Sequence, residues 1–202
     1  LAAEFIHATM TQPQRPKLFV RINPIDSADA EADIAEVVLA GPDGIVQPKP
    51  NSGHDVQRLS IALGHAEERA ARRHPTRILP IVTETPTSVL QLSTYIGASS
   101  RTIGMSWGAE DLSAVVGSLS SRTPDGMLTS PYRLVRDLCL LTAAAADVQP
   151  VDTVFVKHLL PNGEMKHRGK PVDLTAIRRC AIMAVEGEKD DISGLGQTYA
   201  AQ

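Results

Sequence analysis

Apolar and polar positions follow two alternating patterns from the start of the chain to about residue 156. Short, β-branched apolar runs predict buried strands, and longer amphipathic stretches predict helices. The expected strands are residues 17–23, 43–49, 76–85, 101–108 and 151–156. The expected helices are residues 26–40, 52–74, 85–97 and 130–148, and residues 1–10 also have a helical pattern. This regular alternation predicts a parallel sheet covered by helices, either closed as a barrel or open and doubly wound.

Residues typical of helix starts and stops support two of these helices. Asp26 and Ser27 are both candidate N-caps of the helix at 26–40, and Gly41 is its expected stop. Pro86 lies near the first turn of a later helix, where proline is well tolerated.

Charged side chains follow four successive predicted strands, at or just beyond their carboxyl ends. They are Arg21, Lys49, Glu84 and Asp111. The carboxyl ends of the strands in a β/α barrel converge on one mouth, so we expect these side chains to share a pocket. No G-x-G-x-x-G motif follows the early strands, which leaves a dinucleotide-binding sheet unsupported. This placement favours the barrel.

The two acids suit a hard divalent cation. Mg²⁺ usually takes one or two carboxylates together with water and substrate oxygens, and it polarises carbonyl groups. The planar guanidinium of Arg21 matches a substrate carboxylate. The structural alternative is that Glu84 caps its own helix, while Glu110 and Asp111 begin the next one. Spacing alone favours this alternative, because acids are common at helix starts.

Four motifs in order resemble the citrate lyase beta-subunit family, which includes malyl-CoA and related acyl-CoA lyases. The motifs are LFVRINP, DGIVQPK, PIVTET and WGAEDLSAVVG, and the likeness runs from about residue 3 to 156. The resemblance implies a (β/α)₈ barrel and a Mg²⁺ cofactor. It implies that Glu84 and Asp111 are the metal ligands and that Arg21 binds the substrate.

The resemblance also implies a reaction, the aldol-type cleavage or condensation of a 3-hydroxyacyl thioester. The thioester, on coenzyme A or on an acyl-carrier protein, would split into a smaller acyl thioester and a keto acid. Arg21, Glu84 and Asp111 would be catalytic, with Arg21 stabilising the charge that forms. Lys49 and Asp152 are further candidate substrate-binding residues, although a solvated loop position suits Lys49 equally well.

Residues from about 152 to 202 resemble another family, the C-terminal part of intracellular polyhydroxyalkanoate depolymerases, which are α/β-hydrolases. The stretch AIMAVEGEKDDISG would carry the acid of a catalytic triad, best matched by Asp190. The chain has no G-x-S-x-G elbow and no histidine after His167, so hydrolysis by a serine triad is not expected.

Together the two resemblances predict a chimera. Residues 1–156 would form an incomplete (β/α)₈ (TIM-type) barrel lacking its first and last units, and residues 157–202 a short α/β-hydrolase-like tail. The acidic loop that opens the lyase family and the glycine-rich stretch that closes its barrel have no counterpart here. The exposed sheet edges would favour poor solubility or pairing into a homo-oligomer.

Composition and charge limit the partners. The chain has 202 residues, a net charge of -3 and no basic block, which argues against nucleic acid and anionic membranes as main partners. No apolar run is long enough to span a bilayer. The chain has 2 cysteines, and Cys139 is expected to be buried and inert, which fits a reduced, cytoplasmic setting.

Three hypotheses on function follow: a Mg²⁺-dependent carbon–carbon lyase, a remnant of a polyester hydrolase, and an inactive or partner-dependent fragment. The remaining chemically active side chains have weaker patterns. His54, His65, His158 and His167 lack metal-ligand spacing, Trp107 suits core packing, and Ser106 and Ser113 lack a nucleophile elbow.

Overall fold

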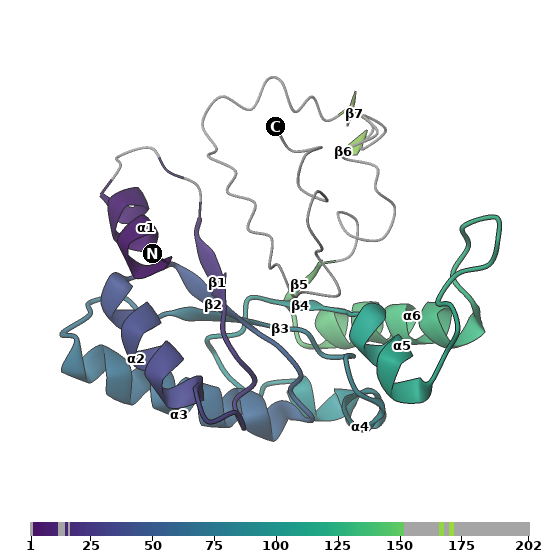
Figure 1. Ribbon diagram of the computed structural model, residues 1–202, viewed down its shortest axis with the longest axis horizontal. Helices are drawn as coiled ribbons and strands as arrows, with labels where there is room; N and C mark the ends of the chain where they lie inside the picture. The colour runs from purple at the N-terminus through teal and green to yellow at the C-terminus, as the bar shows by residue number, and fades with distance from the viewer. Residues whose placement is uncertain (1, 12–14, 16, 152–165, 168–169, 172–202) are drawn as a thin grey trace. The chain divides into compact units, whose positions relative to one another are not determined.

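The computed structural model describes residues 2–11, 15, 17–151, 166–167 and 170–171 (Figure 1). The chain divides into two compact units, one made of residues 1–12 and 17–151 and the other of residues 13–16 and 152–202. In the second unit, the described residues form an antiparallel hairpin of β6 (Lys166–His167) and β7 (Lys170–Pro171).

Five parallel strands follow one another in chain order across the first unit. β1 (Phe19–Arg21), β2 (Gly44–Gln47) and β3 (Arg77–Pro80) form one ladder, and β4 (Gly104–Ser106) pairs with β5 (Gln149–Val151). Parallel bridges from Ile78 to Thr102 and from Ile81 to Ser106 join the two ladders. A doubly wound sheet reverses its strand order, whereas this order progresses in one direction, as in a β/α barrel. The predicted α/β class is confirmed.

One helix precedes the first strand, and the others connect the successive strands. They are α1 (Ala2–Met10), α2 (Ala30–Ala40), α3 (Gly53–Arg69), α4 (Pro86–Leu90), the 3₁₀ helix η1 (Leu92–Tyr95), α5 (Glu110–Val116) and α6 (Ser130–Ala145). Right-handed crossovers between neighbouring parallel strands place such helices on one face of a sheet. Figure 1 shows α2 lying beside α3 along one side of the strands. None of the helices in the described part has the length and apolar character that a membrane crossing requires.

The observed bounds correct several expectations. The helix expected at 26–40 starts only at Ala30, so Asp26 and Ser27 are not its caps; Asp26 instead pairs with Arg58 of α3 at 2.7 Å. Its expected stop is confirmed, because Gly41 takes the left-handed conformation at φ 87°.

One helix and the strand β5 also have bounds that differ from those predicted. The helix expected at 85–97 is divided into α4 and η1 at Gln91, whose φ is −116°. The strand expected at 151–156 begins earlier, at Gln149, and its residues beyond Val151 lie outside the described part.

The core lies between the strands and the helices that cover them. Ile45 and Ile78 are neighbours across the ladder of β2 and β3, and both are fully buried, as are Leu59 and Leu63 of α3. Each such side chain contributes roughly 1.5–3 kcal/mol when it leaves water. The strands are therefore firmly packed, and they fix the starting points of the loops at their carboxyl ends.

A buried ion pair fastens α3 to the sheet. The guanidinium of Arg101 contacts both carboxylate oxygens of Glu67, at 2.9 and 2.8 Å. The Thr76 N–H also donates to Glu67, and Arg101 donates to the Thr76 carbonyl at 3.2 Å. Burial acts to raise the pKa of Glu67, but the hydrogen bonds from Arg101 and Thr76 outweigh it and hold the pKa below its usual value.

The substitution Arg101→Ala is expected to lower the free energy of unfolding by about 3 kcal/mol, because it leaves the Glu67 carboxylate buried without its cation. Urea denaturation at pH 7 measures this. Lys17→Ala is the matched control; Lys17 pairs with Asp43 but is 80% exposed, and its loss should cost less than about 1 kcal/mol.

The same comparison has an expected pH dependence. The pKa of Glu67 is lowered on folding, so its contribution is present above the ordinary value of 4.5 and is lost as the pH falls through the folded pKa. The gap between wild type and Arg101→Ala should therefore shrink in acid. Equal losses for the two variants at pH 7 would contradict the role given to this pair.

Candidate active site

The four charged residues singled out from the sequence meet at the carboxyl ends of the first four strands. Arg21 ends β1, Lys49 follows β2, Glu84 follows β3, and Asp111 lies in the first turn of α5 after β4. Arg21 Nη2 lies 3.6 Å from Glu84 Oε1 and 3.8 Å from Asp111 Oδ2, and Lys49 Nζ lies 2.8 Å from Asp111 Oδ1. The predicted convergence is therefore present. Asp152 lies outside the described residues.

Glu84 is the buried centre of this group. Its side chain is 4% exposed, and one of its oxygens accepts a hydrogen bond from the backbone N–H of Lys49 at 2.5 Å. The cap of α4 is Thr85, whose hydroxyl accepts from the Ser88 N–H at 3.1 Å. The alternative in which Glu84 caps its own helix is therefore wrong. Asp111 does lie in a first helical turn, and it belongs to the charged group as well.

The loop that follows β4 approaches Glu84 closely because it contains a glycine. A Cβ on Gly108 would lie 2.8 Å from Glu84 Cγ, too close for any larger residue to fit without displacing the glutamate. The Gly108 N–H donates to the buried hydroxyl of Thr83 at 3.0 Å, which holds the loop against the end of β3. Sequence reasoning did not give Gly108 a role, although it stands within the GAED motif.

Lys49 adopts an unusual backbone conformation. Its φ is +50°, in the left-handed region that non-glycine residues rarely occupy. This conformation presents the Lys49 N–H to Glu84 while the ammonium group reaches Asp111. Backbone strain of this kind tends to concentrate at functional sites, where the surrounding structure enforces it. Lys49 therefore contacts both carboxylates of the group, while its side chain remains 44% exposed.

The two carboxylates have opposite protonation preferences. Burial raises the pKa of Glu84 to about 7; the hydrogen bond from the Lys49 N–H opposes this shift, and a hydrogen bond with Asp111 adds to it. Burial also acts to raise the pKa of Asp111, but hydrogen bonds with Lys49 and Glu84 outweigh it, so that this pKa lies below its usual value. Near neutral pH, Asp111 is ionised and Glu84 is close to the midpoint of its titration.

This donor set fits Mg²⁺ better than a softer metal. In the described part of the chain, no group of three or more histidine, cysteine, aspartate or glutamate side chains is placed to hold an ion. The protein would thus supply the two carboxylates of Glu84 and Asp111, as Mg²⁺ sites often do, with water and substrate oxygens completing the shell. The side-chain nitrogens of Arg21 and Lys49 lie beside these carboxylates, where positive charge is favoured.

Most of the other residues considered from the sequence are exposed, buried in the core, or hydrogen-bonded to the backbone. Glu110 is exposed, as are His54 and His65. Trp107 and Cys139 are buried, as expected for core positions. The hydroxyl groups of Ser106 and Ser113 donate to backbone carbonyls, of Val151 at 3.3 Å and of Ala109 at 2.7 Å. His158, Cys180 and Asp190 lie outside the described residues.

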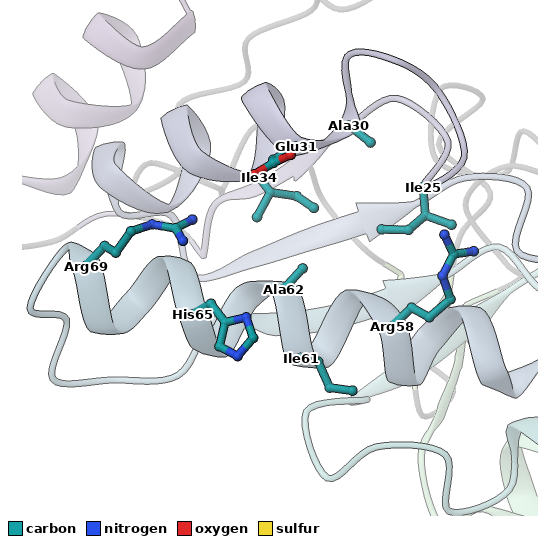
Figure 2. Close-up of a pocket in the computed structure, with 9 residues that line it drawn as sticks. All are labelled: Ile25, Ala30, Glu31, Ile34, Arg58, Ile61, Ala62, His65 and Arg69. Carbon is teal, nitrogen blue, oxygen red and sulfur yellow. The ribbon is translucent and has the colours of Figure 1, made fainter.

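A separate groove of about 410 Å³ lies between α2 and α3 and includes none of the four charged residues (Figure 2). Ile25, Ile34 and Ile61 give it apolar walls, and Arg58 and Arg69 of α3 face the same groove. Its lining does not overlap the candidate active site.

Fold and site together define a class: an α/β protein whose successive parallel strands bring a carboxylate pair and two cations to one edge. Comparison with known proteins agrees. The chain is 33% identical over 136 residues to citrate lyase subunit beta of Haemophilus influenzae, covering 67% of this chain and 45% of that protein. It is 30% identical over 155 residues to a citrate lyase subunit beta-like protein of Mycobacterium tuberculosis, covering 77% and 50%.

Solved structures give the same result. Protein CitE of Mycobacterium tuberculosis, in complex with magnesium and acetoacetate, matches with a TM-score of 0.61 and 28% identity over 80% of this chain and 60% of that one. A citrate lyase beta subunit from the same organism, complexed with oxaloacetate and magnesium, matches with a TM-score of 0.56 and 30% identity over 72% and 58%. The chain spans about half the length of the curated relatives it matches.

The tail has its own match. A family model described as the C-terminus of PHB de-polymerase matches residues 132–202. Both resemblances predicted from the sequence, to citrate lyase beta subunits and to the C-terminal part of polyhydroxyalkanoate depolymerases, are therefore confirmed. The second begins earlier than expected, since it includes α6 and β5 of the first unit.

The substitution Asp111→Asn is expected to lower the pKa of Glu84 below 7, because it removes the neighbouring negative charge that favours a proton on Glu84. Carbon-13 NMR of the glutamate carboxyl groups, titrated without added metal, measures this. Glu110→Gln, which removes the adjacent but exposed acid, should leave the titration unchanged. A Glu84 titration that is the same in Asp111→Asn and wild type would exclude the proposed coupling.

Proposed function

We propose that this chain carries the site of a Mg²⁺-dependent carbon–carbon lyase, which cleaves or forms a 3-hydroxyacyl thioester of the citryl- or malyl-CoA kind by an aldol-type reaction. The observation that carries the proposal is the meeting of Glu84, Asp111, Arg21 and Lys49 at one edge of the sheet. The names of the relatives support the lyase class, and the titles of the structural neighbours support magnesium with keto acids or coenzyme A.

Each side chain has a role that follows from its chemistry. Glu84 and Asp111 would hold Mg²⁺, which when bound polarises the carbonyl group of the keto acid. The exposed face of the Arg21 guanidinium would bind a substrate carboxylate through two parallel hydrogen bonds. Lys49, which lies 2.8 Å from Asp111, would bind a second anionic group of the substrate.

The cleavage reaction balances within the substrate. The 3-hydroxyl group loses its proton, its oxygen becomes the carbonyl oxygen of the keto acid, and the bond between carbons 2 and 3 breaks. The electron pair of that bond passes to carbon 2 of the thioester as an enolate, which then takes up a proton. Arg21 and Lys49 supply positive charge beside these oxygens, in a site where the adjacent Glu84 is shielded from water.

We also propose that the five strands are consecutive strands of an incomplete (β/α)₈ barrel, because they progress in one direction with a helix after each of the first four. Completion of that barrel by a second copy of the chain would make the protein a homo-oligomer. We also propose a cytoplasmic location, which agrees with these assignments.

A second candidate function is supported by the family match over residues 132–202, which raises a polyester-hydrolase remnant. An esterase assay on a short 3-hydroxyalkanoate ester separates the candidates. Ester hydrolysis that persists in a metal chelator and in Glu84→Gln would favour the remnant, and the absence of ester hydrolysis in the unmodified chain would count against it.

Titration calorimetry of the full chain with Mg²⁺, in the presence of glyoxylate or oxaloacetate, tests the primary proposal. Glu84→Gln and Asp111→Asn should each weaken Mg²⁺ binding at least tenfold, because each removes one of two protein ligands. Glu110→Gln is the control and should bind as wild type. A folded protein without Mg²⁺ affinity, or with an affinity that neither substitution changes, would overturn the proposal.

Mg²⁺ binding should also depend on pH. The pKa of Glu84 without metal is about 7, and a metal ligand must be ionised, so below pH 7 the affinity should fall by roughly tenfold for each pH unit. Above pH 8 it should level off. Calorimetry between pH 5.5 and about 8.5 measures this slope, and a flat profile would show that Glu84 is not the ligand that titrates.

A further inference from the structure

The left-handed conformation of Lys49 needs a support that the charged group itself does not provide. The Lys49 side chain and N–H contact the carboxylates, and two residues later the Asn51 N–H donates to Asp55 at 2.8 Å while the Asn51 side-chain oxygen accepts from Thr85 at 2.9 Å. None of these contacts reaches the carbonyl of Pro50, the residue between them. Residues 48–52, here called the lysine loop, connect β2 to α3 and carry Lys49 between two prolines. What fixes the lysine loop therefore decides where both donors of Lys49 point.

Tyr95 contacts the lysine loop from η1. Its ring is 2% exposed, and its hydroxyl donates to the carbonyl of Pro50, the residue directly after Lys49, at 2.9 Å. A buried hydroxyl without a partner is costly, so this bond is strongly favoured in the folded chain. The tyrosine thus holds the Pro50–Asn51 peptide, one peptide beyond the strained residue.

Ser88 links the same tyrosine to the strand end that precedes Glu84. The Ser88 hydroxyl lies 2.6 Å from the Tyr95 hydroxyl and donates to the Val82 carbonyl at 2.6 Å. Each hydroxyl has one proton, so only two of the three contacts are hydrogen bonds at any time; when Tyr95 donates to Pro50, the Ser88 proton goes either to Val82 or to Tyr95. Each of the two carbonyls lies within two residues of a member of the charged group. Both hydroxyls are buried.

The close approach of η1 to the lysine loop depends on a glycine at the start of α3. A Cβ on Gly53 would lie 1.9 Å from the Thr94 carbonyl oxygen, so no other residue fits there. The Gly53 N–H donates to the Thr94 hydroxyl at 2.8 Å. This contact brings η1, and with it Tyr95, against the far end of the lysine loop.

We propose that Tyr95, whose hydroxyl also contacts that of Ser88, is a positioning residue that holds Lys49 in its left-handed conformation and so aims its N–H at Glu84 and its ammonium group at Asp111. Among the described residues, the Tyr95 hydroxyl contacts Ser88 and the Pro50 carbonyl and neither of the two carboxylates. Tyr95 therefore acts through the Pro50 carbonyl. Its importance for catalysis rests on the proposed function; its effect on Lys49 does not.

Amide hydrogen exchange of the full chain, measured by NMR without metal, tests the effect on Lys49 directly. In Tyr95→Phe, the Lys49 amide should exchange at least tenfold faster than in wild type, while the amides of β4 and α6 change much less. Tyr132→Phe is the matched control, because Tyr132 is 1% exposed and its hydroxyl accepts from Ser113, away from the lysine loop. Ser88→Ala leaves the Tyr95 hydroxyl to donate to Pro50 and should keep most of the Lys49 protection.

Two results would overturn the proposal. One is a Lys49 amide in Tyr95→Phe that exchanges as slowly as in wild type. The other is an equal acceleration in Tyr132→Phe, which would indicate a general loss of stability. If Tyr95→Phe does not fold, the double variant Lys49→Gly with Tyr95→Phe should regain folding, because glycine takes a positive φ without strain; failure of the double variant as well would also overturn it.

Calorimetry with Mg²⁺ and oxaloacetate then connects positioning to function. Tyr95→Phe should weaken the ternary complex about tenfold, and Tyr132→Phe should not. If wild type itself binds no Mg²⁺, the proposed function fails, whereas the exchange comparison still decides whether Tyr95 positions Lys49.

Discussion

The carboxylate of Glu84 is buried beside a second carboxylate, and the loops at four strand ends are arranged around that constraint. A buried acid next to a like charge is stable only if it keeps a proton or gains compensating donors. Here the compensation comes from the Lys49 N–H, the Lys49 ammonium and the Arg21 guanidinium. These donors come from two strand ends, those of β2 and β1, and the acids follow β3 and β4, so the direct parallel order of β1 to β4 is what allows the cations and the acids to meet.

Sequence patterns were sufficient to predict the alternating elements and the four charged side chains at the strand ends. They could not decide whether Glu84 caps its own helix or belongs to the charged group, because acids are common at helix starts; the Thr85 cap and the burial of Glu84 decide it. They also placed helix caps at Asp26 and Ser27, where none form. Asp26 pairs instead with Arg58, a residue far away in the chain, so the local pattern could not indicate this contact. Local signals do not report such competition.

The supports of the site were invisible for a related reason. The positive φ of Lys49 carries no residue signature, because the left-handed region is usually occupied by glycine or asparagine. The approach of Gly108 to Glu84 and the bond from Tyr95 to Pro50 join different loops, and no periodicity encodes them. Sequence reasoning therefore identified the groups that carry chemistry and missed the groups that hold them in place.

The depolymerase-type match starts at a residue that contacts α5 through Ser113. Tyr132 is almost fully buried, and its hydroxyl accepts a hydrogen bond at 2.9 Å from Ser113 of α5, the helix whose first turn carries Asp111. All four charged residues precede the match, yet α6 and β5 complete the unit that holds them. A helix followed by a parallel strand is common to barrels and to open α/β sheets. One such unit can therefore serve as the continuation of a lyase-type sheet and as the start of a hydrolase-type segment, so a junction between the two families is structurally tolerable where the matches overlap.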